Sequence, residues 1–172
     1  MSLRLPDLEG VVESHFDDSS LTEAGQQPHL VVIMGPVAAG KTTVRRQRYG
    51  TGHVLVDAAE IFIRLSAGTY YDFPSVLEGA MSRVAEQVAD RAIAERRNVV
   101  TEIVGMDEDS AKALIGDFRS INYAVQVDYV DCDVDESVRR NAARGDDSVS
   151  AYYAEPYNIL WLRNAARQAR VR

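Results

Sequence analysis

The sequence predicts an α/β fold, in which a mostly parallel sheet of at least four strands has helices on both faces. Two observations lead to this prediction. Short apolar segments rich in β-branched residues alternate along the chain with longer segments of helical periodicity. One of the strand-to-helix junctions also carries a glycine-containing turn of the kind that opens a helix at the edge of a parallel sheet. Strands joined through helices pair in parallel, by right-handed crossovers.

The first strand and the turn after it form the most informative segment. Residues 30–34 read Leu-Val-Val-Ile-Met, an apolar run that is short and β-branched enough to be a buried strand. The run leads into Gly35-x-x-x-x-Gly40-Lys41-Thr42, a complete P-loop motif, and a stretch compatible with a helix follows over 41–48. A strand before the motif and a helix after it are the context that the motif requires.

A P-loop binds the phosphates of a nucleotide, because its backbone N–H groups point inward at the N-terminus of a helix. In this chain Lys41 would reach the β- and γ-phosphates, and the Thr42 hydroxyl would ligate Mg²⁺. Related loops often carry another glycine where Ala38 and Ala39 stand, and a left-handed backbone angle there costs alanine more than glycine. The residues expected to contact the nucleotide are Gly35, Pro36, Val37, Ala38, Ala39, Gly40, Lys41, Thr42 and Thr43.

The other elements follow in order along the chain. Further strands are expected at residues 53–56, 98–104 and 123–130. Apolar residues recur every three or four positions from Leu77 to Ala92, which predicts a long amphipathic helix. Besides the helix after the P-loop, helices are expected over 57–66, 75–97, 109–119, 133–144 and 153–170. The elements together predict the three-layer sandwich of a P-loop NTPase.

Residues 1–28 are expected to form an acidic extension ahead of a single-core domain at 29–172. The extension carries several acidic residues against Arg4 alone, and it ends at Pro28. We expect a short amphipathic helix in it, followed by a polar connector. The extension either caps the domain or forms a solvated arm. The arm is the preferred interpretation, because chain ends are poorly ordered unless something ties them down.

Length and composition exclude several classes of protein. The chain has 172 residues, which suits one domain, and its net charge of −7 argues against nonspecific nucleic-acid binding. No apolar run is long enough for a membrane span, and the N-terminus lacks the apolar segment of a signal peptide. We therefore expect a cytoplasmic protein. The single cysteine, Cys132, fits that compartment and is expected to pack at a strand end.

Two acidic residues follow expected strands, at the edge of the sheet where parallel strands form a ligand site. Asp57 comes after the second strand. It is half of an Asp57-x-x-Glu60 capping box, or the general base that takes a proton from an attacking hydroxyl group, or both. Glu102 ends the third strand. It would contact Mg²⁺ or a substrate, or would only form an ion pair with an arginine.

Basic and aromatic residues complete the candidate site. Arg140 and Arg144 share one face of the helix after the fourth strand, as two cations that grip a transferring phosphoryl group would. Glu136 precedes Arg140 by one turn, so a surface ion pair is the alternative for Arg140. Arg64 and Tyr70 are expected to line a pocket for the acceptor, although an aromatic loop is as often simple packing.

These residues resemble the zeta-toxin-like P-loop kinases. The matching segments are the P-loop at 35–42, the second strand ending at Asp57, the third strand ending at Glu102, and residues 130–140 after the fourth strand. Zeta toxins are ATP-dependent kinases that phosphorylate a sugar hydroxyl group of UDP-N-acetylglucosamine, and an antitoxin partner blocks their nucleotide site. Chloramphenicol phosphotransferase and gluconate-kinase-like enzymes are similar over the same segments.

The resemblance implies a role for each matching residue. Lys41 and Thr42 would be the phosphate and Mg²⁺ residues, and Asp57 would be the base. Glu102 would contact the substrate or a metal-bound water, and Arg140 or Arg144 would clamp a phosphate. The implied cofactors are ATP and Mg²⁺, and the implied partners are a small molecule with a hydroxyl group and an antitoxin-like protein.

The expected function is therefore an ATP-dependent phosphotransferase that acts on a hydroxyl group, with UDP-N-acetylglucosamine as the first candidate acceptor. The alternative is a nucleotide-dependent switch or partner-binding module with little or no transferase activity. Two features favour the alternative. The expected elements end with a helix where such kinases add a fifth strand and a base-binding loop, and the acidic residues 1–28 could pair with the arginine-rich stretch at 159–172.

Overall fold

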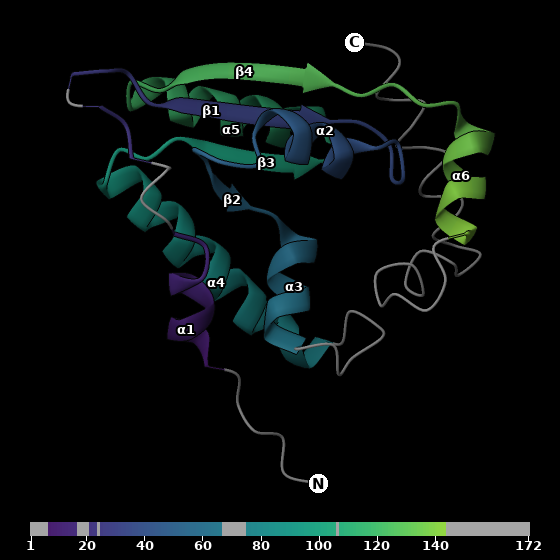
Figure 1. Ribbon diagram of the computed structural model, residues 1–172, viewed down its shortest axis with the longest axis horizontal. Helices are drawn as coiled ribbons and strands as arrows, with labels where there is room; N and C mark the ends of the chain where they lie inside the picture. The colour runs from purple at the N-terminus through teal and green to yellow at the C-terminus, as the bar shows by residue number, and fades with distance from the viewer. Residues whose placement is uncertain (1–6, 17–20, 24, 67–74, 106, 144–172) are drawn as a thin grey trace, which may run out of the picture.

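The computed structural model describes residues 7–16, 21–23, 25–66, 75–105 and 107–143. Four strands form one parallel sheet in the order β2-β3-β1-β4 (Figure 1). The strands are β1 (His29–Met34), β2 (Val54–Val56), β3 (Val99–Ile103) and β4 (Ala124–Tyr129). The helices are α1 (Leu8–Glu13), α2 (Lys41–Arg48), α3 (Ala58–Ser66), α4 (Ser75–Ala94), α5 (Glu108–Ser120) and α6 (Val134–Ala142). The predicted α/β fold with a parallel sheet is confirmed.

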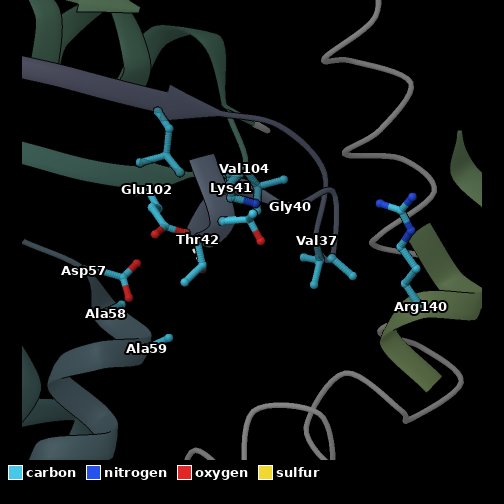
Figure 2. Close-up of a pocket in the computed structure, with 13 residues that line it drawn as sticks. Val37, Gly40, Lys41, Thr42, Asp57, Ala58, Ala59, Glu102, Val104 and Arg140 are labelled. Atoms are coloured by element: carbon cyan, nitrogen blue, oxygen red, sulfur yellow. Dashed lines mark hydrogen bonds between the residues drawn. The ribbon is translucent and has the colours of Figure 1, made fainter. Parts of the chain in front are cut away.

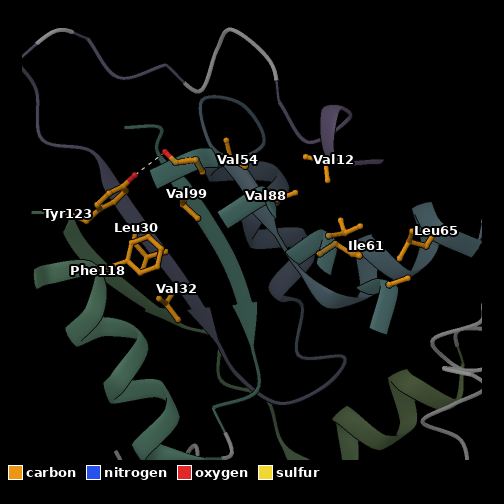
Figure 3. Close-up of a cluster of buried hydrophobic side chains, with 13 residues drawn as sticks. Val12, Leu30, Val32, Val54, Ile61, Leu65, Val88, Val99, Phe118 and Tyr123 are labelled. Atoms are coloured by element: carbon orange, nitrogen blue, oxygen red, sulfur yellow. Dashed lines mark hydrogen bonds between the residues drawn. The ribbon is translucent and has the colours of Figure 1, made fainter. Parts of the chain in front are cut away.

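Strand β1 lies between β3 and β4 and is covered on both faces. Leu30 and Val32 belong to the main core (Figure 3), whereas Val31 and Ile33 belong to a second cluster that includes Tyr49, directly after α2. In Figure 1, α2 lies in front of the sheet and α5 lies behind it. This explains why residues 30–34 of β1 form an unbroken apolar run, since a strand segment that is buried on both faces has no polar side.

Helix α4 supplies much of the main core. Val84, Val88 and Ala92 are fully buried and recur at the four-residue spacing that keeps them on one face. Fully burying one such valine contributes roughly 1.5–3 kcal/mol to the free energy of unfolding. Tyr123 closes one end of this core, where its hydroxyl lies 3.2 Å from the Ala92 carbonyl oxygen and 3.0 Å from that of Arg97 (Figure 3). The polar tip of a buried aromatic residue is thereby satisfied.

Helix α4 ends three residues before the boundary that the sequence predicts at residue 97. Arg96 adopts a φ of 55°, in the left-handed region that terminates helices. Apolar periodicity carries no information on this backbone angle. No glycine stands at residues 95–98 to mark the end of the helix. The reversal brings Asn98 to the start of β3, where its carbonyl oxygen accepts a hydrogen bond from the Val54 N–H at 2.7 Å.

Helix α1 packs on α3 and α4, so the structure supports the capping interpretation for this helix rather than the solvated arm. Val12 is 8% exposed and belongs to the main core cluster. The Arg91 guanidinium lies 4.2 Å from the centre of the Phe16 ring and donates to a Glu13 carboxylate oxygen at 2.6 Å. Although its sequence is acidic, α1 is held on the domain by the burial of Val12 in the core and by the contacts of Arg91.

Three further expectations concern the last helix, membrane spans and the cysteine. The helix expected at 153–170 lies outside the described residues. Among the described helices, none has the length and apolarity that crossing a membrane requires. Cys132 is buried after β4, as expected for a packed thiol.

Candidate active site

The loop between β1 and α2 has the backbone of a phosphate-binding turn. Gly40 adopts a φ of 103° and Ala38 a φ of 58°, so both lie in the left-handed region, the second at the cost that alanine incurs there. Gly35 has no room for a side chain, because a Cβ atom would collide with the Val130 carbonyl oxygen. The Lys41 ammonium donates to the carbonyl oxygens of Gly35 and Pro36 at 2.9 Å each, which keeps it over the loop.

A cavity of about 540 Å³ opens beside this loop, within the size range of small-molecule sites (Figure 2). The ends of β2 and β3, the loop itself and α6 all contribute to its wall. Its lining residues are Val37, Ala38, Gly40, Lys41, Thr42, Thr43, Asp57, Ala58, Ala59, Glu102, Ile103, Val104 and Arg140. The structure therefore brings the P-loop together with Asp57, Glu102 and Arg140.

Glu102 is held by two residues of helix α2. One carboxylate oxygen accepts a hydrogen bond from the Thr42 hydroxyl at 2.9 Å, and the other accepts one from Arg45 Nε at 2.6 Å. The side chains of Arg45 and Glu102 are only 12% and 9% exposed. The ion pair with an arginine, which was the alternative role for Glu102, is thus present, and Thr42 lies at the same carboxylate.

Asp57 has the capping role that the sequence suggests. Its carboxylate accepts a hydrogen bond from the Glu60 backbone N–H at 2.8 Å, at the start of α3. Burial raises the pKa of Asp57 above its ordinary value, and the nearby Glu102 carboxylate adds to the rise, whereas the Glu60 N–H and Arg45 oppose it. Figure 2 shows Asp57 on the same side of the cavity as Thr42 and Glu102. A carboxylate with a raised pKa in a cleft is suited to accept a proton.

Arg140 lies across the cavity from Asp57 (Figure 2). Its Nε donates to a Glu136 carboxylate oxygen at 2.6 Å, so the surface ion pair expected from the sequence is present while the residue also lines the cavity. The side chain is 49% exposed. Helix α6 is attached to the loop through Ser137, whose hydroxyl donates to the Val37 carbonyl oxygen.

Six predicted site residues are not among the described residues that line the cavity. Gly35, Pro36 and Ala39 belong to the P-loop but are outside that lining. Arg64 is outside the set that lines the cavity, because its guanidinium donates to Glu60 at 2.9 Å and to the Ser14 carbonyl oxygen at 2.8 Å, at the end of α1. Tyr70 and Arg144 lie outside the described residues.

Sequence reasoning missed Arg45 as a member of the site. The available signal was its position three residues after Thr42, which places both residues on one face of α2. An arginine on the face that carries a P-loop threonine lies next to the strand end where the acidic residue is expected.

The oxygen atoms at this edge of the sheet fit a magnesium ion. Mg²⁺ binds hard oxygen ligands and is usually held by one or two protein groups together with substrate phosphates. The Thr42 hydroxyl and the Glu102 carboxylate are adjacent, and both line the cavity. Within the described residues, no group of three or more histidine, cysteine, aspartate or glutamate side chains is arranged to hold a metal by itself.

The chain resembles one protein family and several solved structures. A family model described as zeta toxin matches residues 12–167. The structure of the AvrRxo1-ORF1:-ORF2 complex with ATP matches with a TM-score of 0.67 and 16% identity, over 95% of this chain and 55% of that chain. The Pnkp1/Rnl/Hen1 RNA repair complex matches with a TM-score of 0.65 and 18% identity, over 87% and 47%.

A third solved structure is that of the PezAT chromosomal toxin-antitoxin system of Streptococcus pneumoniae. It matches with a TM-score of 0.50 and 16% identity, over 71% of this chain and 52% of that chain. The chain thus spans about half the length of the solved chains that it resembles. A search of curated protein sequences finds no match. At these identities the solved structures show a common fold.

Proposed function

The chain belongs to the zeta toxin family, and we propose that it is an ATP-dependent phosphotransferase that moves the γ-phosphoryl group to a hydroxyl group of a small molecule. The observation that carries this proposal is the cavity in which the P-loop residues Lys41 and Thr42 lie with Asp57 and Glu102. A phosphate-binding loop alone supports nucleotide binding, whereas a carboxylate with a raised pKa on the same cavity supports transfer to a hydroxyl group.

Residues 35–43 would bind the nucleotide, with backbone N–H groups and Lys41 on its phosphates. Lys41 would exchange its contacts to the Gly35 and Pro36 carbonyl oxygens for contacts to the β- and γ-phosphates. Thr42 and Glu102 would hold Mg²⁺, which neutralises negative charge on the phosphates when it is bound. The AvrRxo1-ORF1:-ORF2 structure with ATP supports the choice of nucleotide through the shared fold.

Asp57 would act as the general base. Its carboxylate takes the proton of the acceptor hydroxyl group, and the hydroxyl oxygen forms a bond to the γ-phosphorus atom. The bond between that atom and the β,γ-bridging oxygen breaks, so the products are a phosphate ester and ADP. Arg140, across the cavity, and Arg144 would stabilise the charge on the transferring group.

UDP-N-acetylglucosamine is the first candidate acceptor, on the basis of the family. Asp57 and Glu102 would contact the acceptor from the side of the sheet. Arg64 and Tyr70 are proposed on its other side, although Arg64 in this structure binds Ser14 and Glu60. An acceptor contact from Arg64 therefore requires that its guanidinium leave the end of α1.

Phosphoryl transfer from γ-labelled ATP with Mg²⁺ tests this proposal, with UDP-N-acetylglucosamine and a panel of sugars and alcohols as acceptors. The expected result is label in an acceptor, lost in Asp57→Asn and weakened together with ATP binding in Lys41→Ala. If label appears in an acceptor other than UDP-N-acetylglucosamine, the proposed phosphotransferase activity stands and only the proposed acceptor is wrong. Slow phosphate release that is equal in wild type and Asp57→Asn, without any labelled acceptor, overturns the proposal.

A second candidate is a nucleotide-dependent switch or partner-binding module. It is favoured by the structural contacts of both carboxylates, since Asp57 caps α3 and Glu102 is already bound by Thr42 and Arg45. Because the PezAT structure is described as a toxin-antitoxin system, an antitoxin-like protein is the proposed partner in either case. Capture of such a partner that depends on added nucleotide, from a protein without transferase activity, would favour the switch.

A further inference from the structure

Arg45 is a largely buried cation beside the cavity, and the proposed transfer reaction does not use it. It lies on α2, one turn after Thr42, and its side chain is 12% exposed. Its Nε atom donates to one oxygen of Glu102 at 2.6 Å, and the Thr42 hydroxyl donates to the other at 2.9 Å. A single helix thus supplies two hydrogen-bond donors to a carboxylate on the neighbouring strand β3.

These two contacts restrict Glu102 to one orientation. The backbone of Glu102 is fixed in the sheet, where it pairs with Ile33 of β1. A charged hydrogen bond of this length to a largely buried carboxylate is strong and directional, and an unpaired carboxylate at 9% exposure would be costly. With one oxygen held by Arg45, the other remains directed at Thr42.

The orientation of Glu102 determines that of the Thr42 hydroxyl. A hydroxyl group has one hydrogen to donate and two acceptor lone pairs. When its hydrogen is given to Glu102, both lone pairs of the Thr42 oxygen stay available for a cation in the cavity. Without the Arg45 contact, Glu102 is free to rotate, and the hydroxyl hydrogen can then point where the cation would bind.

We propose that Arg45 is a positioning residue, which fixes Glu102 so that the Thr42 oxygen is presented to the Mg²⁺ ion of the bound nucleotide. The inference rests on the nucleotide-binding part of the proposed function and is independent of the acceptor and of Asp57. Arg45 acts through Glu102, because its guanidinium donates to that carboxylate and Arg45 is not among the described residues that line the cavity.

The test measures how much Mg²⁺ strengthens nucleotide binding. The affinity of the full chain for a fluorescent ATP analogue is determined with saturating Mg²⁺ and with excess EDTA, and the ratio of the two affinities is the magnesium gain. Arg45→Gln is expected to lower the magnesium gain about 10- to 100-fold, the range found when a group that orients a metal ligand is removed. Arg45→Lys, which keeps the charge, is expected to restore part of it.

Arg46→Gln is the matched control. Arg46 is the next residue of the same helix and is exposed, so the substitution removes the same charge from α2 without touching Glu102. It should keep the wild-type magnesium gain. If Arg46→Gln lowers the gain as much as Arg45→Gln, the effect is one of net charge and the proposal is overturned.

A double-mutant comparison separates positioning from a general structural effect. In a Glu102→Gln background, Arg45→Gln should change the magnesium gain little, because the group through which Arg45 acts has been altered. An equal loss in both backgrounds would show that Arg45 acts independently of Glu102. Circular dichroism checks that each variant is folded, and Arg45→Lys carries the test if Arg45→Gln is not.

The outcomes distinguish this inference from the proposed function. A normal magnesium gain in Arg45→Gln overturns the positioning role alone. If the wild-type protein shows the magnesium gain but labels no acceptor, the proposed phosphotransferase activity is overturned and the role of Arg45 stands. A wild-type protein that shows no magnesium gain at all overturns both the Arg45 role and the MgATP part of the proposed function.

Discussion

The Asp57 carboxylate accepts a hydrogen bond from the Glu60 backbone N–H at 2.8 Å, and the same side chain lines the P-loop cavity. The capping role and the position in the cavity therefore coexist. The Glu60 carboxylate contributes to a different contact, since it accepts a hydrogen bond from Arg64 Nε at 2.9 Å. The two proposed roles of Asp57 can be separated by substitutions that keep one and remove the other.

Asp57→Asn should abolish transfer while keeping the helix cap. Asparagine caps a helix about as well as aspartate but cannot take a proton, so we expect a loss of roughly 10²–10⁴-fold in the transfer rate. Asp57→Ala should also lower the free energy of unfolding, by about 1 kcal/mol relative to Asp57→Asn. Transfer assays and urea denaturation of both variants measure the two effects. Equal stability of the two variants would contradict the capping contribution.

The stability difference between wild type and Asp57→Asn should depend on pH. Because burial raises the pKa of Asp57 in the folded state, its protonated form suits the fold better than its charged form. Its stabilising contribution is fully present below the ordinary pKa of aspartate and is lost as the pH rises through the raised value. The free energy of unfolding of wild type minus that of Asp57→Asn should therefore fall across this acidic range and then level off. Urea denaturation of both proteins at several pH values checks it, and a difference that rises with pH would contradict the raised pKa.

Val12→Ala should destabilise the whole domain. Val12 is 8% exposed and packs in the main core although it belongs to the N-terminal helix α1. Removing its methyl groups is expected to lower the free energy of unfolding by about 1–2 kcal/mol, through lost burial and the cavity that is left. Glu9→Ala, on the exposed face of α1, is the control and should have little effect. A solvated α1 in solution would make the two variants equally stable.

Local pattern was sufficient to predict the elements that surround the P-loop. The helix over 41–48 and the strand before it follow from an apolar run, two glycines and a lysine, all close in sequence. The packing of α1 could not be predicted in this way. It depends on contacts such as that between Phe16 and Arg91, which are brought together only by the fold.

Contacts that only the fold creates also limit what the sequence predicts about the site. Strand ends made Asp57 and Glu102 candidates, because parallel strands bring their carboxyl ends to one edge. The contact between Arg45 and Glu102 joins residues 57 positions apart and requires the crossing of α2 over β3. The spacing of Thr42 and Arg45 places both on one face of α2, but it does not identify the strand residue that they contact. A capping hydrogen bond, in contrast, joins residues three positions apart, so the sequence was sufficient to predict the one at Asp57.

The two alanines of the P-loop differ in backbone conformation, although they are adjacent and similarly buried. Ala38 has a φ of 58°, whereas the φ of Ala39 is not positive. The two residues are 9% and 7% exposed. Replacing either residue by glycine removes one buried methyl group, at about 0.8 kcal/mol, and makes the unfolded chain more flexible, at about 0.4–1 kcal/mol. At Ala38 alone, the substitution also relieves a left-handed conformation that costs an alanine roughly 1–2 kcal/mol.

Ala38→Gly should consequently be more stable than Ala39→Gly by about 1–2 kcal/mol, since the losses common to both substitutions cancel in the comparison. Relative to wild type, Ala38→Gly should be nearly neutral and Ala39→Gly clearly destabilised. Urea denaturation of the three proteins under identical conditions measures these differences. Equal free energies of unfolding for the two variants would mean that Ala38 does not hold a left-handed angle in solution, and the loop geometry that orients the phosphate-binding N–H groups would have to be revised.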